Sequence, residues 1–172
     1  HRRWFESHLK NFDVIYKNRS DDFHGLALSG PKSRDLLQKL VRENISNENF
    51  KFRDVREMFV AWVPAIVNRI SFTGELGYEI YVAPHFQLKL YEEIEAVGKE
   101  FNLKPFGGRA LMSMRLEKNW GAWTLDYRPD FTAKETGLDK FINWDKEFIG
   151  KESAKKDISQ SKLVSLMVET ND

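Results

Sequence analysis

The hydrophobic positions of this chain form two kinds of pattern: short strand-like runs and longer stretches with helical spacing. Runs rich in β-branched and aromatic residues are typical of strands. They occur at residues 12–17, 24–29, 57–63, 65–72 and 78–82. The last two runs are joined by Thr73-Gly-Glu-Leu-Gly77, whose two glycines suit an irregular hairpin. The pattern predicts a sheet built mainly from the middle of the chain.

Helices are predicted where apolar residues recur at intervals of three and four. They are expected at residues 4–9, 33–41, 86–97, 108–120 and 152–157. Gly30-Pro31 precedes the second of these and is typical of a helix start, and Gly98 is a good C-terminal cap for the third. In that third helix, Leu88, Tyr91 and Ile94 lie on the predicted apolar face.

Adjacent strands and grouped helices favour an α+β fold with a mixed or antiparallel sheet and helices on one face. We expect residues 1–56 to be the remainder of a first subdomain. Residues 57–157 are expected to form a second α+β subdomain carrying the Thr-Gly-Glu turn. The alternating run at 162–168 predicts that residues 158–172 are a linker and the first strand of a C-terminal β domain. The chain has no initiator Met, so we expect it to be incomplete at both ends.

Composition narrows the possible partners. The 172 residues include 27 Lys plus Arg against 26 Asp plus Glu, so no global field favours nucleic acid or an anionic membrane. The absence of cysteine excludes disulfides, thiolate nucleophiles and Cys-ligated metals, and it favours a reducing, cytoplasmic compartment. There is no glycine-rich nucleotide fingerprint and no long apolar run. We predict a small-molecule ligand, no metal site, no membrane span and no nucleic-acid partner.

The segment from Arg69 to Glu79 has the residues that a planar, hydrogen-bonding ligand requires. Phe72 and Tyr78 offer aromatic faces, and Glu75 can accept two N–H donors from an amidine-like edge such as that of a pterin or purine. The alternative interpretation is a hairpin turn with an exposed glutamate, which is common.

This segment resembles the R-x-[ST]-[YF]-T-G-E-x-G-[WYF]-E motif of the folate-binding aminomethyltransferase family, which includes the T-protein of the glycine cleavage system. Four further stretches resemble the family in the same order. They are residues 24–34 with Gly-Pro-Lys-Ser-Arg, residues 114–118 with Met-Arg-Leu-Glu-Lys, residues 132–138 with Thr-Ala-Lys-Glu-Thr-Gly-Leu, and residues 148–151 with Phe-Ile-Gly-Lys. The Arg-Leu-Glu-Lys stretch followed by Gly121-Ala-Trp123 is most similar to the version fused to dimethylglycine and sarcosine dehydrogenases.

The resemblance implies transfer of a one-carbon unit from a glycine-derived aminomethyl group, dimethylglycine or sarcosine to tetrahydrofolate. FAD is implied only if a dehydrogenase domain is attached. The implied partners are a homodimer or a flavin dehydrogenase domain, and the implied compartment in a eukaryote is the mitochondrial matrix. This chain then corresponds to the central part of the family fold. The alternative function is a non-catalytic folate-fold binding or scaffold module.

The resemblance also assigns cofactor-binding roles to six residues of this chain. Glu75 anchors the pterin edge, and Phe72 and Tyr78 shape its slot. Trp123 closes one side, while Arg69 or Arg115 balances the folate charge. The alternatives are that Arg69 pairs with a structural carboxylate, that Arg115 supports buried backbone groups and that Trp123 fills a gap between subdomains.

Two departures from the family pattern affect polar groups. Leu111 stands where the family's helix usually carries a folate-site arginine. The family's catalytic Asp lies in a D-x-x-x-W or D-x-x-W context, and if Trp4 is that tryptophan, the Asp falls at or before the chain start. His1, Arg2 and Arg3 stand there instead. The catalytic residue is therefore unknown from this sequence.

Overall fold

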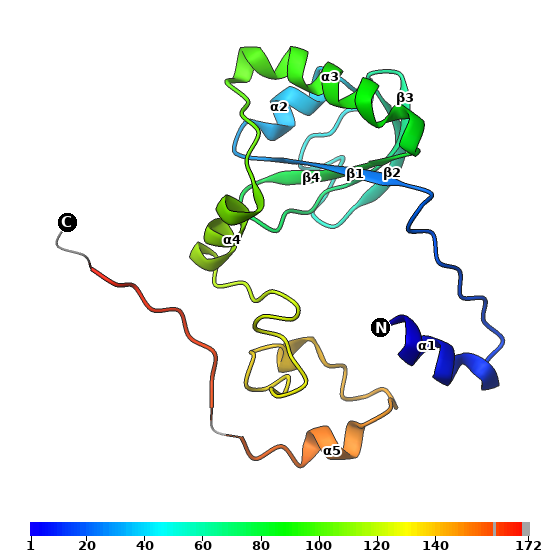
Figure 1. Ribbon diagram of the computed structural model, residues 1–172, viewed down its shortest axis with the longest axis vertical. Coiled ribbons are helices and arrows are strands. Elements are labelled where there is room, and N and C mark those ends of the chain that lie inside the picture. Colours follow the sequence, from blue (N-terminus) through cyan, green and yellow to red (C-terminus); the bar gives the residue numbers. More distant parts are fainter. Residues whose placement is uncertain (160, 170–172) are drawn as a thin grey trace. The chain divides into compact units, whose positions relative to one another are not determined.

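The computed structural model describes residues 1–159 and 161–169. The chain divides into two compact units (Figure 1). The first comprises residues 1–71 and 75–104, and the second comprises residues 72–74 and 105–172.

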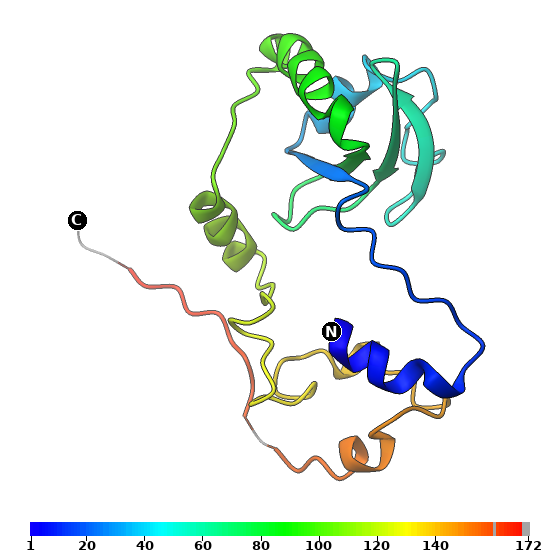
Figure 2. The ribbon, with the colours of Figure 1, turned by 45° about the vertical axis from the view of Figure 1, so that its right-hand side comes forward.

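A four-stranded antiparallel sheet forms the centre of the first unit (Figures 1 and 2). Its strands are β1 (His24–Ser29), β2 (Val55–Val60), β3 (Val63–Asn68) and β4 (Gly77–Val82), in the spatial order β1-β4-β3-β2. β2 and β3 form a hairpin with a two-residue turn. β4 pairs with both β1 and β3 and is therefore a central strand.

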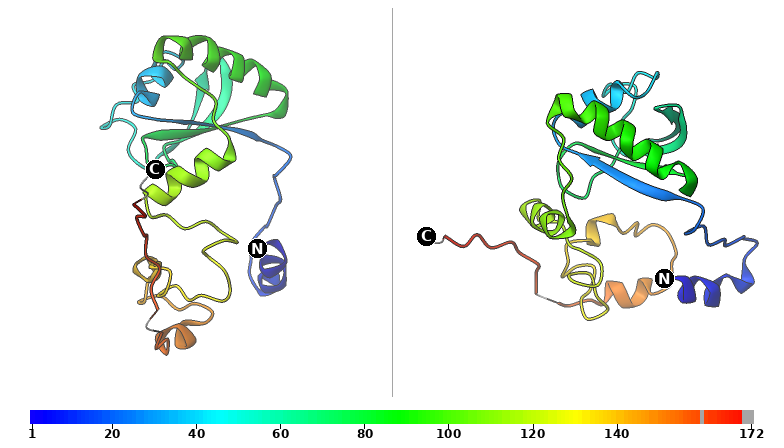
Figure 3. Two further views of the ribbon diagram at one scale, coloured as in Figure 1. Left: turned by 60° about the vertical axis from the view of Figure 1, so that its left-hand side comes forward. Right: turned by 45° about the horizontal axis from the view of Figure 1, so that its top comes forward.

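Two helices, α2 (Ser33–Gln38) and α3 (Gln87–Gly98), pack on one face of this sheet (Figure 3). The core between the two layers consists of aliphatic side chains with Phe50 and Tyr78. Its fully buried members include Leu36, Leu37, Ile45, Val60, Val67, Ile80, Val82 and Leu90. Burial of each such side chain contributes roughly 1.5–3 kcal/mol to folding, so this cluster stabilises the first unit.

The buried stripe of α3 differs from the predicted one. Leu90, Ile94 and Gly98 are buried at intervals of four residues, whereas Leu88 and Tyr91 are exposed. Both stripes contain Ile94, and the helical period alone cannot distinguish two faces that share a residue. Gly98 lies where a Cβ atom would stand 2.4 Å from the side chain of Leu103, so the helix has to end with a glycine at this close approach.

The α+β prediction, with an antiparallel sheet and helices on one face, is confirmed. The predicted subdomain boundary between residues 56 and 57 lies inside β2. β1, which precedes this position, pairs with β4, which follows it, so the two sides share one sheet. The predicted strand at 12–17 is not formed, and Ile15 there is 98% exposed. In the described stretch 161–169, the run predicted as a strand is also irregular.

The other helices are α1 (Arg2–His8), α4 (Gly108–Glu117) and α5 (Lys151–Lys155). Short 3₁₀ turns are η1 (Leu9–Asn11), η2 (Pro84–Phe86), η3 (Lys99–Phe101) and η4 (Asp139–Phe141). Residues 121–138 contain no helix or strand. Within the described chain, every helix is too short or too polar to cross a membrane.

Candidate functional site

The Thr-Gly-Glu turn follows β3 and leads into β4. The Thr73 side chain is buried and Glu75 is exposed. Gly74 between them has φ +90°, a conformation that side chains disfavour, and a Cβ atom there would lie 3.0 Å from Cδ of Lys118. The turn therefore requires glycine at this position, and it presents the Glu75 carboxylate on the surface.

The Leu76 carbonyl oxygen links this turn to the segment between β1 and α2. It accepts the Gly30 N–H at 2.8 Å and the hydroxyl of buried Ser33 at 3.0 Å. The next residue, Gly77, has no space for a side chain, since a Cβ atom would lie 2.6 Å from Cβ of Ser71. Two of the sequence motifs are thus joined by backbone geometry, and the residue directly after Glu75 is fixed.

Arg69 directly follows β3, and its guanidinium binds the loop before β2. Its two terminal nitrogens donate to the Phe50 carbonyl at 2.5 Å and to the Asn47 side-chain oxygen at 2.7 Å. Arg34 donates to the same Asn47 oxygen at 2.7 Å. Nε of Arg69 is buried without a hydrogen-bond partner. The partners of Arg69 are therefore neutral oxygens rather than the structural carboxylate considered from sequence.

Tyr78 and Phe72 differ in exposure. Tyr78 is fully buried and stacks on Phe50 with ring centroids 6.0 Å apart, and its hydroxyl accepts a hydrogen bond from Nε of Arg34 at 3.2 Å. Phe72 is half-buried. Tyr78 thus supports the motif from the core side, and Phe72 retains an accessible aromatic surface.

The glutamate that ends the motif belongs to the sheet. The Tyr81 hydroxyl donates to the Glu79 carboxylate at 2.5 Å. This hydrogen bond, together with partial burial and the nearby negative charge, raises the pKa of Tyr81 to about 12. Glu79 and Tyr81 lie two residues apart on β4 and so share one face of the sheet.

Arg115 and Trp123 belong to the second unit, where a short loop folds back on α4. Arg115 is buried and donates to the Trp120 carbonyl at 3.0 Å and to Asp126 at 2.6 Å. Asp126 also accepts the Ala122 N–H at 2.8 Å. Trp123 is 65% exposed and meets Tyr127 edge to face, with ring centroids 5.5 Å apart. Arg115 thus holds the loop that presents Trp123.

The structure groups the predicted residues by unit. Arg69 and Tyr78 share contacts with Phe50 and are linked through Arg34 and Asn47. Arg115, on α4, is hydrogen-bonded to the loop that carries Trp123. Sequence reasoning missed Asn47, Ser33 and Asp126, which hold these groups in place. Ser33 could have been found from the Gly-Pro-Lys-Ser stretch, but no local pattern marks Asn47. No cluster of three possible metal ligands occurs within residues 1–159 and 161–169.

Comparison with known protein families identifies the domain to which these residues belong. Residues 1–146 match the model of the GCVT N-terminal domain. This chain belongs to that family. The predicted resemblance to the aminomethyltransferase family, including its dehydrogenase-fused version, is confirmed.

Three relatives illustrate the range of proteins that contain this GCVT-type region. Dimethylglycine dehydrogenase of Homo sapiens is 36% identical over 177 residues, covering 99% of this chain and 20% of the relative. Aminomethyltransferase of Thermoanaerobacter sp. (strain X514) is 34% identical over 90% of this chain and 42% of its own length. Sarcosine oxidase subunit alpha of Corynebacterium sp. (strain P-1) is 32% identical over 87% of this chain and 16% of its own length.

The chain therefore spans a fifth of the length of the dimethylglycine dehydrogenases it matches and less than half of the aminomethyltransferases. Among solved structures, heterotetrameric sarcosine oxidase from Corynebacterium sp. U-96, in complex with pyrrole 2-carboxylate, superposes with a TM-score of 0.49 at 19% identity. That match covers 59% of this chain and 51% of the other.

Proposed function

We propose that this GCVT-type chain contributes the tetrahydrofolate-contacting turn of an aminomethyltransferase-like enzyme that transfers a one-carbon unit from an amine donor to tetrahydrofolate. The observation that carries the proposal is the exposed Glu75 on a turn whose backbone is fixed on both sides. The φ of +90° at Gly74 requires glycine, and the Leu76 carbonyl is held by two hydrogen bonds. A carboxylate that faces solvent from a fixed stretch of backbone is suited to orient a ligand with little reorganisation.

The roles of the aromatic and acidic residues follow from their exposure. The Glu75 carboxylate accepts the paired N–H groups of the pterin edge, which form stronger hydrogen bonds with an ionised acceptor than with a neutral one. Phe72 offers its accessible ring to the pterin face. Tyr78 acts from below, because its buried ring on Phe50 supports the start of β4.

The arginines and Trp123 have supporting roles in this proposal. Arg69 adds positive charge near the turn while its guanidinium holds the Asn47–Phe50 loop. Arg115 has its charge balanced by Asp126, and its part is to fix the loop that exposes Trp123 for ligand contact. The positive charge of Arg69, whose partners are neutral oxygens, favours the carboxylate tail of folate. The chain's own residues thus bind and orient the cofactor.

The rest of the activity is proposed for the whole protein. The donor is an aminomethyl group, dimethylglycine or sarcosine, and the relatives' names favour an N-methylated glycine. FAD would be held by another domain, because this chain has no glycine-rich dinucleotide motif. The compartment is mitochondrial in a eukaryote, as for the human relative, and cytoplasmic otherwise. A homodimer or an attached flavin dehydrogenase domain completes the assembly.

Isothermal calorimetry with tetrahydrofolate on the full protein tests this proposal. Glu75→Ala is expected to weaken binding at least tenfold, because the paired hydrogen bonds to an ionised group are lost. Glu57→Ala is the matched control, since it removes a carboxylate from β2 that is also exposed. An unchanged dissociation constant for Glu75→Ala, with Glu57→Ala also unchanged, would rule out Glu75 as the anchor.

A further inference from the structure

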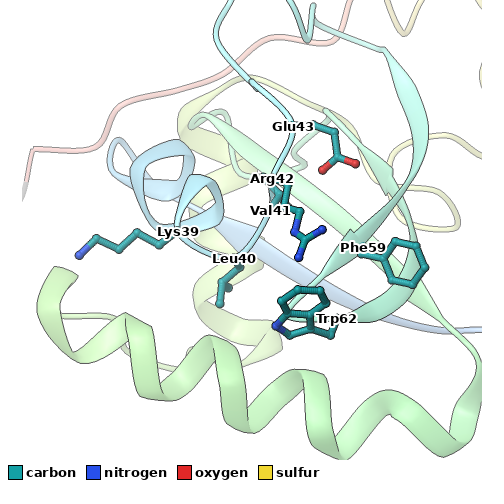
Figure 4. A pocket seen from close by; sticks show the side chains of 7 residues that line it. All are labelled: Lys39, Leu40, Val41, Arg42, Glu43, Phe59 and Trp62. Carbon is teal, nitrogen blue, oxygen red and sulfur yellow. The ribbon is translucent and has the colours of Figure 1, made fainter.

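A depression of about 410 Å³ opens where β3 begins, whereas the Thr-Gly-Glu turn follows the other end of that strand (Figure 4). It lies between the β2–β3 turn and the segment that follows α2. Its lining residues are Lys39, Leu40, Val41, Arg42, Glu43, Phe59 and Trp62. Since β3 runs for six residues between the two ends, about 20 Å separates this depression from Glu75. It is therefore distinct from the proposed folate contact.

The turn that borders the depression has an unusual backbone. Ala61 has φ +49° and Trp62 has φ +67°, in the left-handed region that two-residue hairpins usually fill with Asn and Gly. The Ala61 N–H donates to the Leu40 carbonyl at 2.8 Å, which ties the turn to the segment after α2. Residues held in such strained backbone conformations are concentrated at functional sites.

Trp62 is placed on the surface by this turn and is 74% exposed. Phe59, on β2, is also exposed beside it (Figure 4). Val60 and Val63, on either side of the turn, are buried in the core of the first unit, whereas Phe59 and Trp62 are exposed and contribute little to it. Two exposed aromatic side chains therefore border the depression.

Arg42 lies over the Trp62 ring, with its guanidinium carbon 4.1 Å from the ring centroid. Within the part of the chain that the structure describes, Arg42 has no carboxylate within ion-pair distance. Lys39 extends away from Arg42 (Figure 4), and its ammonium pairs with Glu100. A guanidinium stacked on an aromatic face keeps its N–H edges free for bidentate binding of a carboxylate. The depression thus combines an available cation with an apolar wall.

We propose that this depression is a binding site for a small monocarboxylate with a flat apolar body. The Arg42 fork binds the carboxylate, and the Trp62 and Phe59 side chains contact the apolar body. Glu43 also lines the depression, and its negative charge disfavours anions that carry two charges. The volume lies within the range of sites that bind small molecules.

NMR titration of the full chain with phenylacetate tests the proposal, with the indole N–H signal of Trp62 as the reporter. Saturable shifts are expected in the millimolar range. Phenylacetamide, which has the same shape without the charge, is expected to bind at least tenfold more weakly. Inorganic phosphate is expected to give no saturable shift with the parent chain. In Glu43→Gln, which lacks the repelling carboxylate, phosphate is expected to shift the Trp62 signal more than in the parent chain.

Arg42→Met is the decisive variant, because Arg42 is exposed and its replacement leaves the core intact. It is expected to lower phenylacetate affinity at least tenfold, while Lys39→Met, which removes a cation already paired with Glu100, changes affinity less than twofold. Equal affinity of Arg42→Met and the parent chain, equal binding of phenylacetamide, or absence of a saturable shift would each overturn the proposal.

Discussion

The Ser33 hydroxyl donates to the Leu76 carbonyl oxygen at 3.0 Å, across 43 residues of sequence. Ser33 opens α2, and Leu76 directly follows Glu75. A residue at the start of a helix therefore sets the backbone position of the proposed folate anchor. The Gly30 N–H donates to the same oxygen, so the position is fixed by two independent donors.

Ser33→Ala should lower the free energy of unfolding by about 1 kcal/mol, because one buried hydrogen bond is lost while Gly30 still satisfies the Leu76 oxygen. Urea denaturation measures the change. Ser20→Ala is the control: its hydroxyl binds Asn18 on the surface, and its loss should have an effect below about 0.5 kcal/mol. Equal effects of the two substitutions would show that the Ser33 bond is not special.

Gly77→Ala should destabilise the sheet by roughly 1–3 kcal/mol, because the new methyl group would lie 2.6 Å from Cβ of Ser71. The thermal unfolding midpoint reports the change. Gly108→Ala adds a methyl group in open space on α4 and is expected to be neutral or slightly stabilising. The additional change Ser71→Gly should restore part of the stability of Gly77→Ala; no restoration would contradict the steric explanation.

Asp126→Asn should loosen the loop after α4 at a cost of about 2 kcal/mol, since it leaves the buried charge of Arg115 without its ionic partner. The amide of Ala122, which binds Asp126, should then exchange with deuterium faster. Asp130→Asn removes a carboxylate that meets Arg128 at 3.4 Å on the surface, and it should leave this exchange unchanged. Unchanged exchange at Ala122 in Asp126→Asn would refute the structural role of the ion pair.

Tyr81 should ionise only at high pH, because the Glu79 carboxylate accepts a hydrogen bond from its hydroxyl and raises the pKa of Tyr81 to about 12. A folded-state pKa above the unfolded value near 10 means that the contribution to stability is complete below about pH 10 and is lost as the pH rises towards 12. The difference in phenolate absorbance between the parent chain and Tyr81→Phe measures this ionisation. In Glu79→Gln it should move to lower pH; ionisation near pH 10 in the parent chain would contradict the prediction.

The secondary structure of the first unit could largely be predicted from sequence, because its local signals agree with its packing. The strand at 24–29 and the helix start after Gly30-Pro31 occur where predicted. Residues 12–17 have the composition of a strand, but a strand also needs a pairing partner, and composition does not supply one. The run at 162–168 likewise has the alternation of a strand, but it has no pairing partner among the described residues and is irregular.

The candidate site could be predicted as a set of residue types but not as a set of contacts. The motif identifies Glu75 and Tyr78, yet the burial of Tyr78 depends on Phe50, which lies in a loop without periodicity. Arg69 could be assigned to the ligand or to the protein, and only the positions of Asn47 and the Phe50 carbonyl show that its donors are used internally. Long-range partners of this kind leave no local trace in a sequence.

The buried apolar side chains of the described residues belong almost entirely to the first unit, with Ala122 as the exception in the second. The heat capacity change on unfolding comes mainly from apolar surface that becomes hydrated. A calorimetric transition of this chain should therefore report on the sheet with α2 and α3, and the polar loop around Arg115 can open without a comparable heat signature.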